Sequence, residues 1–260
     1  MTQSTTQARV AFISGANQGI GRAVAVRLAK EYGFAVIIGS RNLSAGQAVA
    51  DELRAAGHTA TAVQLDVTSD ESIAAAVAAV ETGYGRLDVL INNAGICLDK
   101  GAAVFKGEQS ELPTRELFER TFNTNVFGVA CLTEALLPLL KRQPTTEASP
   151  APPRVIFVST RMGAFSYATD RTTTSWALDY KAYESSKAAL NMLAVHYARI
   201  LEEMGGCANA VCPGLVSTNL IGFHAAGAPV EVGTQRIVEL ATMEKPPNGT
   251  FSEKDGPVGW

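Results

Sequence analysis

The sequence contains a tyrosine and a lysine four residues apart, a pair that could take part in proton transfer. Tyr183 and Lys187 open the stretch Tyr183–Met204, in which apolar residues recur at steps of three and four, as in an amphipathic helix. Residues four apart share one helix face, so the phenol and the ammonium can point the same way. A phenol has a pKa near ~10, and a neighbouring ammonium favours the phenolate. The pair indicates proton transfer, although this spacing also occurs by chance in many helices.

Three glycines after the first apolar run could bind a phosphate group. Such a strand-to-helix turn puts backbone N–H groups and the positive end of a helix where a pyrophosphate can sit. Gly15 permits the tight turn, Gly19 lets the backbone approach the phosphates, and Gly21 lets the helix pack on the strand. The spacing G-x-x-x-G-x-G differs from the commonest dinucleotide fingerprint, and a tight turn without a ligand stays open. The candidate residues of this loop are Gly15, Asn17, Gln18, Gly19, Ile20 and Gly21.

The residues after the second apolar run bear on which dinucleotide would bind. An acidic residue there would bind the ribose hydroxyls of NAD, but the chain has Ser40 and Arg41. A hydroxyl and a guanidinium suit a 2′-phosphate, which favours NADP(H). The alternative is that Arg41 is a solvated residue at a helix start. Asp66, followed by Val67, could accept a hydrogen bond from an adenine amine or lie beside a helix N-cap.

Small and amide-bearing residues follow the fourth apolar run. Asn93, Ala94 and Gly95 would lie at the C-terminal edge of a parallel sheet, where ligands bind in this architecture. An ordinary turn rich in Asn and Gly is the alternative.

Short apolar runs that alternate with helical patterns would position all of these residues. Near-continuous apolarity suits parallel strands covered on both faces. The alternation predicts an α/β fold: a single-domain, Rossmann-type doubly wound parallel sheet with helices on both faces, over residues 1–260. The predicted strands are Val10–Ser14, Ala35–Gly39, Thr61–Leu65, Val89–Asn92, Val155–Ser159 and Ala208–Cys212. The predicted helices are Ile20–Tyr32, Leu43–Ala56, Ser69–Thr82, Thr114–Lys141 and Tyr183–Met204. The proline-rich segment Gln143–Pro153 is interpreted as a surface loop rather than a domain boundary, because the alternation resumes after it.

Composition argues against several other classes of protein. The 260 residues are 47% hydrophobic and 18% charged, with a formal net charge of −3. This is globular usage without the basic excess that nucleic acid or an anionic membrane surface attracts. No run of ~18 apolar residues suggests a membrane span, and the N-terminus lacks an apolar signal region. Four cysteines and three histidines show no metal-ligand spacing, so we expect no metal site and a cytoplasmic protein with reduced thiols.

Together the motifs resemble the short-chain dehydrogenase/reductase family. The matching segments occur in order: SGANQGIG, LDV, NNAG, Asn125 within NTNVFG, VIFVST, YESSK and CPGLVST. Arg41 and the tail NGTFSEKDGPVGW look most like the NADPH-dependent carbonyl-reductase branch.

The resemblance implies a role for each matched residue. Tyr183 would donate a proton to a substrate carbonyl. Lys187 would bind the nicotinamide ribose and lower the pKa of Tyr183, and Asn125 would hold a water in a proton relay. The alternative for Asn125 is an amide inside a helix that bonds to bent backbone. Further cofactor contacts are implied for Asn93, Ala94, Gly95, Pro213, Gly214, Val216 and Thr218.

Two features depart from the family pattern. Thr160 stands where the family has its catalytic serine, and strand alternation would turn the adjacent Ser159 to the other face. Tyr183 lies 23 residues after Thr160, more than in compact members, and the segment Ala168–Ala182 accounts for the excess.

These features predict an NADPH-dependent oxidoreductase that reduces a ketone or aldehyde, or oxidises the alcohol, with Tyr183 as the proton donor. Thr160 keeps a second hypothesis open: a cofactor-binding protein with weak redox turnover that acts as a regulator or a non-redox cyclase. Whether copies pair into a homo-oligomer is left open. A small hydrophobic substrate would contact Ile96–Leu98, Arg161–Phe165, Ala168–Ala182 and Asn219–Ala226.

Overall fold

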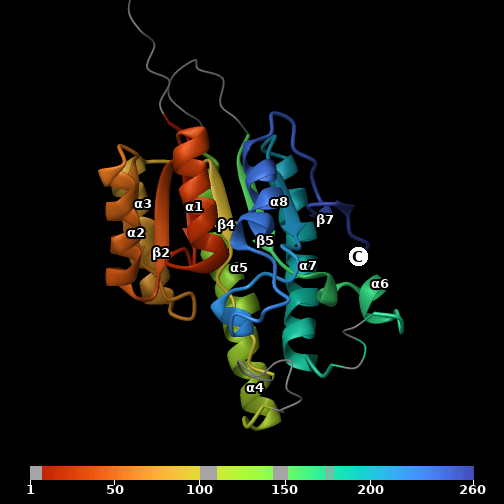
Figure 1. Cartoon of the computed structure of the whole chain (residues 1–260). Helices are drawn as coiled ribbons and strands as arrows, with labels where there is room; N and C mark the ends of the chain where they lie inside the picture. Colours follow the sequence, from red (N-terminus) through yellow and green to blue (C-terminus); the bar gives the residue numbers. More distant parts are fainter. Residues whose placement is uncertain (1–7, 100–109, 143–151, 174–175, 177) are drawn as a thin grey trace, which may run out of the picture.

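The computed structural model describes residues 8–99, 110–142, 152–173, 176 and 178–260 (Figure 1). One eight-stranded sheet runs through it in the order β3-β2-β1-β4-β5-β6-β7-β8. Neighbouring strands pair in parallel from β3 to β7, and only β8 runs antiparallel to its neighbour. The strands are β1 (Val10–Ser14), β2 (Ala35–Ser40), β3 (Ala60–Gln64), β4 (Val89–Asn92), β5 (Arg154–Val158), β6 (Cys207–Val211), β7 (Phe251–Glu253) and β8 (Gly256–Pro257).

Helices cover both faces of this sheet. One core contains buried residues of α1, α2 and α8, and a second contains those of α3, α5 and α7. Successive residues of β1 alternate between the two cores, with Phe12 in one and Ile13 in the other, as the pleat of a strand requires. The helices are α1 (Gly19–Tyr32), α2 (Leu43–Ala55), α3 (Asp70–Tyr84), α4 (Thr114–Phe122), α5 (Gly128–Leu140), α6 (Phe165–Ala168), α7 (Lys181–Glu202) and α8 (Val230–Thr242).

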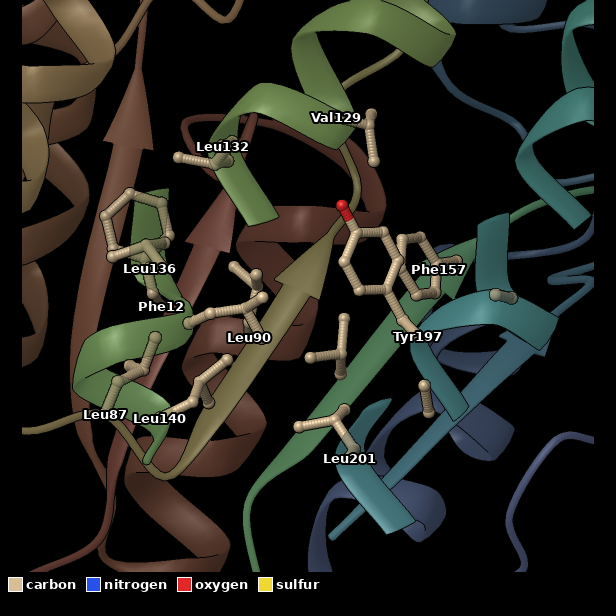
Figure 2. Close-up of a cluster of buried hydrophobic side chains, with 14 of the residues drawn as sticks. Phe12, Leu87, Leu90, Val129, Leu132, Leu136, Leu140, Phe157, Tyr197 and Leu201 are labelled. Carbon is tan, nitrogen blue, oxygen red and sulfur yellow. The ribbon is translucent and has the colours of Figure 1, made fainter. Parts of the chain in front are cut away.

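A hydrophobic core lies between the sheet and helices α5 and α7. In Figure 2, Leu132, Leu136 and Leu140 of α5 lie over Phe12 and the neighbouring strands. From α7, the ring of Tyr197 stacks on Phe157 of β5 with 5.7 Å between ring centroids. The hydroxyl of Tyr197 donates to the Glu134 carboxylate of α5 at 2.9 Å, so that the two helices are joined by a polar contact as well as by packing.

The predicted doubly wound fold is confirmed, and the predicted strands agree with the observed ones to within one residue at each end. Three features were not predicted: helix α8, the short α6, and the edge pair β7 and β8. The last two strands span three and two residues, too few for a periodicity to show. The predicted loop 143–153 lies outside the described residues except at 152 and 153, as do residues 1–7 of the N-terminus.

The predicted helix Thr114–Lys141 is interrupted by a π-helical segment, Asn123–Phe127, between α4 and α5. Such insertions are rare and are frequent at functional sites. The continuous helical stretch Thr114–Leu140 is long and apolar enough to cross a membrane by length and composition alone, but 56% of its most apolar window is buried. Burial against the sheet identifies it as a core helix.

Candidate active site

The glycine loop has the backbone geometry that a phosphate-binding turn needs. Gly15 and Gly19 have φ of 66° and 55°, the left-handed region that favours glycine. A Cβ at Gly21 would lie 2.5 Å from Asn93 Nδ2 and 2.7 Å from the Gly15 carbonyl, so only glycine fits there. The side chain of Gln18, at the N-cap of α1, makes no capping hydrogen bond. The first-turn amides of α1 are therefore left for an anionic ligand.

The segment after β4 is hydrogen-bonded to the start of the glycine loop. The hydroxyl oxygen of Ser14 accepts hydrogen bonds from the backbone N–H groups of Asn93 and Ala94, both at 3.0 Å. The amide of Asn93 donates to the carbonyls of Ser14 at 2.9 Å and Gly15 at 3.1 Å. The side chain of Asn93 thus stabilises the conformation of the glycine loop. Ser14 was missed in the sequence, because its role depends on a partner about eighty positions later.

The two residues predicted to hold a 2′-phosphate lie differently. Ser40 is buried, and its hydroxyl donates to the Asn42 carbonyl at 2.8 Å. Arg41 is exposed at the end of β2. Asp66 accepts from the N–H and the hydroxyl of Thr68 at 2.9 and 2.7 Å. These bonds, with a smaller contribution from Arg41, hold the pKa of the Asp66 carboxyl below its usual value. The adjoining Val67 is buried against Gly128, where a Cβ would lie 2.3 Å from the Val67 carbonyl oxygen.

Tyr183 and Lys187 lie in the first two turns of α7. The Lys187 ammonium donates to the Val158 carbonyl at 2.9 Å and lies 5.7 Å from the centroid of the Tyr183 ring. Burial lowers the pKa of Lys187 to about 8. Burial also raises the pKa of Tyr183 above its usual value, and nearby Cys97 and Cys212 add to the rise. In the chain alone, burial outweighs the ammonium, so the phenol holds its proton at neutral pH.

Asn125 connects three parts of the site. It is fully buried in the π-helical segment. Its Oδ1 accepts from the Ile96 N–H at 2.8 Å, and its Nδ2 donates to the Ile96 carbonyl at 2.8 Å. The same Nδ2 also donates to the Ser186 hydroxyl of α7 at 3.0 Å. The side chain joins the segment after β4 to α7, and both N–H groups of its amide are used in these contacts.

Thr160 and Ser159 face different partners, as strand alternation predicted. Ser159 is buried, and its hydroxyl is 2.6 Å from the Asn191 Oδ1 of α7. The Thr160 Oγ1 accepts from the Met162 N–H at 3.3 Å, which leaves its hydroxyl proton free to be donated. A Cβ at Gly163 would lie 2.7 Å from the backbone carbon of Lys187. Glycine there lets the turn after Thr160 approach α7.

The segment after β6 closes the other side of the cradle. A cavity of about 310 Å³ is bounded by Gln18, Gly19 and Arg22 of the glycine loop and α1, and by Thr218, Asn219 and Phe223. Val216 is buried and pairs with Ala228. Gly214 has φ of 78° next to Pro213, and Phe223 is a non-glycine residue with φ of 54° and 67% exposure.

Several aromatic side chains lie in the segment between β5 and α7 and at the C-terminus. Phe165 and Trp176 are exposed, and the Arg171 guanidinium lies 5.3 Å from the centroid of the Trp176 ring. Arg161 forms an ion pair with Glu253 of β7. The C-terminal Trp260 packs on Phe251, and its carbonyl accepts from the Ser166 N–H, so the C-terminus lies beside α6 (Figure 1). Residues 174, 175 and 177 of the predicted substrate segment lie outside the described residues.

Within the described residues, no group of three or more His, Cys, Asp or Glu side chains is placed to hold a metal ion.

A Rossmann-type sheet with a glycine cradle and a Tyr-x-x-x-Lys helix defines a class of nicotinamide-dependent oxidoreductase. Residues 9–226 match the family model described as short chain dehydrogenase. The chain is 31% identical over 294 residues to (+)-neomenthol dehydrogenase of Arabidopsis thaliana, over 94% of this chain and 95% of that protein. It belongs to the short-chain dehydrogenase/reductase family, as the motifs predicted.

Two solved structures show the same fold over nearly the whole chain. Salutaridine reductase from Papaver somniferum has a TM-score of 0.75 at 27% identity and covers 95% of this chain and 99% of its own. An NADPH-bound carbonyl reductase from chicken fatty liver has a TM-score of 0.80 at 24% identity and covers 98% of this chain and all of its own. The second likeness concerns the fold alone.

Proposed function

We propose that this protein is an NADPH-dependent reductase of a ketone or aldehyde, able to oxidise the corresponding alcohol. The observation that carries the proposal is the convergence of three motifs at Gly95. A Cβ there would lie 3.3 Å from Asn125 Oδ1 and 3.5 Å from Lys187 Nζ. The segment after β4, the π-helical segment and α7 thus meet at the C-terminal edge of the sheet.

The residues present fit a dinucleotide with a 2′-phosphate. The left-handed glycines, the uncapped start of α1 and the close packing at Gly21 form a cradle that larger side chains would fill. Arg41 is exposed where the 2′-phosphate would lie, and a guanidinium binds phosphate in a bidentate manner. The Ser40 hydroxyl would have to break its hydrogen bond to the Asn42 carbonyl in order to bind the 2′-phosphate. Arg41 is therefore the main selector in this proposal.

The chain's own residues supply proton transfer and orientation. A bound NADPH supplies the hydride for the carbonyl carbon. Tyr183 is protonated at neutral pH, since burial raises the pKa of a phenol that is already well above 7, and it donates its proton to the carbonyl oxygen. Thr160 donates a hydrogen bond to the same oxygen as negative charge develops there. Lys187, held by the Val158 carbonyl, binds the nicotinamide ribose and stabilises the phenolate left on Tyr183.

The substrate that fits is a small hydrophobic carbonyl or alcohol compound. Phe165 and Trp176 in the segment before α7, and Phe223 in the segment after β6, are exposed aromatic residues. Two relatives, a (+)-neomenthol dehydrogenase and a salutaridine reductase, have names that refer to a small organic alcohol and to reduction of a small organic compound. We also propose that residues 1–260 form one domain in the cytoplasm, without nucleic-acid or membrane partners; the four unpaired cysteines fit a reducing compartment.

NADPH oxidation tests the proposal, measured with monoterpene ketones, aromatic ketones and quinones as substrates. We expect turnover with NADPH, and a near-complete loss of turnover in Tyr183→Phe while NADPH binding is retained. NADPH binding without turnover on any substrate would favour the alternative, a cofactor-binding regulator or non-redox cyclase. That alternative stays open because Thr160 stands where the family has its catalytic serine. Substantial activity in Tyr183→Phe would rule out the proposed acid.

A further inference from the structure

The catalytic helix is capped by a residue that is distant in the sequence. Asp99, in the segment after β4, is only 4% exposed. Its Oδ1 accepts from the Ala182 N–H at 2.8 Å, and its Oδ2 accepts from the Tyr183 N–H at 2.9 Å. These are first-turn amides of α7, whose own N-cap residue, Tyr180, makes no side-chain capping bond. Both carboxylate oxygens therefore serve the turn that carries Tyr183.

We propose that Asp99 is a positioning residue for the reaction: its carboxylate fixes the first turn of α7, and with it the Tyr183 phenol. The negative charge of Asp99 is the second part of the same role, because a charge beside the phenol disfavours the phenolate. The inference rests on the proposed role of Tyr183 as the acid. No sequence motif marks Asp99, because its partners lie about eighty positions further along the chain.

The positioning part follows from the place of Tyr183 in the helix. The first four N–H groups of a helix have no partner within it, and the first turn frays unless something binds them. A charged acceptor at a helix N-terminus is also favoured by the helix dipole. Because Tyr183 is in this turn, fraying would move the phenol away from Lys187, whose Nζ lies 5.7 Å from the ring centroid. A capped turn keeps the acid in one place through the reaction.

The charge part follows from the groups around Asp99. The titratable groups that interact with Asp99 are Cys97 on its own segment, Tyr180 before α7, and the α7 residues Lys181, Tyr183 and Glu184. A negative charge disfavours a second one nearby. Burial and then Asp99 raise the pKa of Glu184 to about 7, and Asp99 adds to the rise for Tyr183. Removing the charge should lower the pKa of Tyr183.

A titration of the cofactor-free protein tests the charge part without any substrate. The six tyrosines are labelled at the ring carbon that bears the hydroxyl, and Tyr183→Phe assigns the Tyr183 resonance. In Asp99→Asn, which keeps the shape and one acceptor oxygen, we expect the pKa of Tyr183 to fall by about one unit. An unchanged pKa would overturn the charge part, whether or not the protein turns out to be an NADPH reductase.

A matched control separates positioning from general destabilisation. Asp88 is also buried and accepts a backbone N–H, that of Val10 at 2.6 Å, but it precedes β4 at the opposite edge of the sheet. Both Asp99→Asn and Asp88→Asn should lower the melting temperature. Only Asp99→Asn should lower kcat, by about tenfold, with NADPH affinity within about twofold of the parent.

Equal kcat values in the two variants at a temperature where both are folded would overturn the positioning part. If Asp99→Asn does not fold, Asp99→Ser replaces it, since the hydroxyl is a neutral acceptor that also removes the charge. The same fall in the pKa of Tyr183 and in kcat is expected of it, and their absence contradicts the proposal equally.

Discussion

The Asn125 amide donates to the Ser186 hydroxyl at 3.0 Å, and this bond joins the π-helical segment to the catalytic helix. Ser186 in turn donates to the Tyr183 carbonyl at 2.7 Å. The position of the catalytic turn is thus connected to the irregular segment through two hydrogen bonds. This contact gives a structural reason for the π-helical insertion, because Asn125 has to reach both Ile96 and α7.

Asn125→Ala should reduce both stability and turnover. The change leaves the Ile96 N–H and carbonyl without their side-chain partner in a buried place, and each unsatisfied buried group costs ~1–3 kcal/mol. Denaturant unfolding should show a loss of about 2–4 kcal/mol in the free energy of unfolding. Ser186→Ala, which removes only one of these contacts, should lose less. Equal losses in the two variants would show that the contact to Ile96 matters little.

Arg41→Ala should weaken the preference for NADPH. A hydrogen bond to a charged group contributes ~1.5–3 kcal/mol, which corresponds to about a tenfold to hundredfold fall in kcat/KM for NADPH. The kcat/KM for NADH should stay within about twofold of the parental value. Ser40→Ala is the comparison: its hydroxyl bonds to the Asn42 carbonyl, so its effect on cofactor selection should be much smaller. Equal use of NADPH and NADH by the parent protein would contradict the proposed role of Arg41.

Thr160→Val should lower kcat strongly while keeping the shape of the side chain. A donor aimed at the developing oxyanion contributes ~2.7–4 kcal/mol, or about a hundredfold to a thousandfold in kcat. Thr160→Ser, which keeps the hydroxyl, should stay close to the parent. Ser159→Ala removes the bond to Asn191 and should act mainly on unfolding. If Thr160→Val turns over at the parental rate, the hydroxyl is not the donor, and Tyr183 acts without it.

Lys187 should make the cofactor-free protein more stable as pH rises through the window from about 8 to about 10. Burial lowers the folded pKa to about 8, whereas an unfolded lysine has a pKa near ~10.4. Between these values the unfolded chain binds more protons than the folded one, so the free energy of unfolding increases with pH. Buried thiols act in the opposite sense, so the measurement is the difference between the parent and Lys187→Met across urea unfolding curves. A difference that does not change between pH 8 and about 10 would contradict the buried, shifted ammonium.

The fold class and the residues proposed to do the chemistry follow from the sequence alone. Strands β1 to β6 and helices α1 to α3 and α7 follow from local periodicity, which depends on neighbouring residues only. Tyr183 and Lys187 are four apart on one helix, and Gly15, Gly19 and Gly21 belong to one turn. Features of this kind need no knowledge of distant parts of the chain, because spacing and backbone freedom are local properties.

The hydrogen-bond partners of these residues and the shifts in their pKa values depend on the tertiary structure. Asp99 caps α7, Asn125 bonds to Ser186, and Ser14 supports the segment of Asn93, all through contacts between residues far apart in the sequence. The pKa directions of Tyr183 and Lys187 likewise reverse the local expectation, because burial by several elements outweighs the four-residue pairing. A local pattern specifies which groups share a helix face. Which buried acceptors and charges surround them depends on which segments the sheet places side by side at the carboxyl ends of its strands.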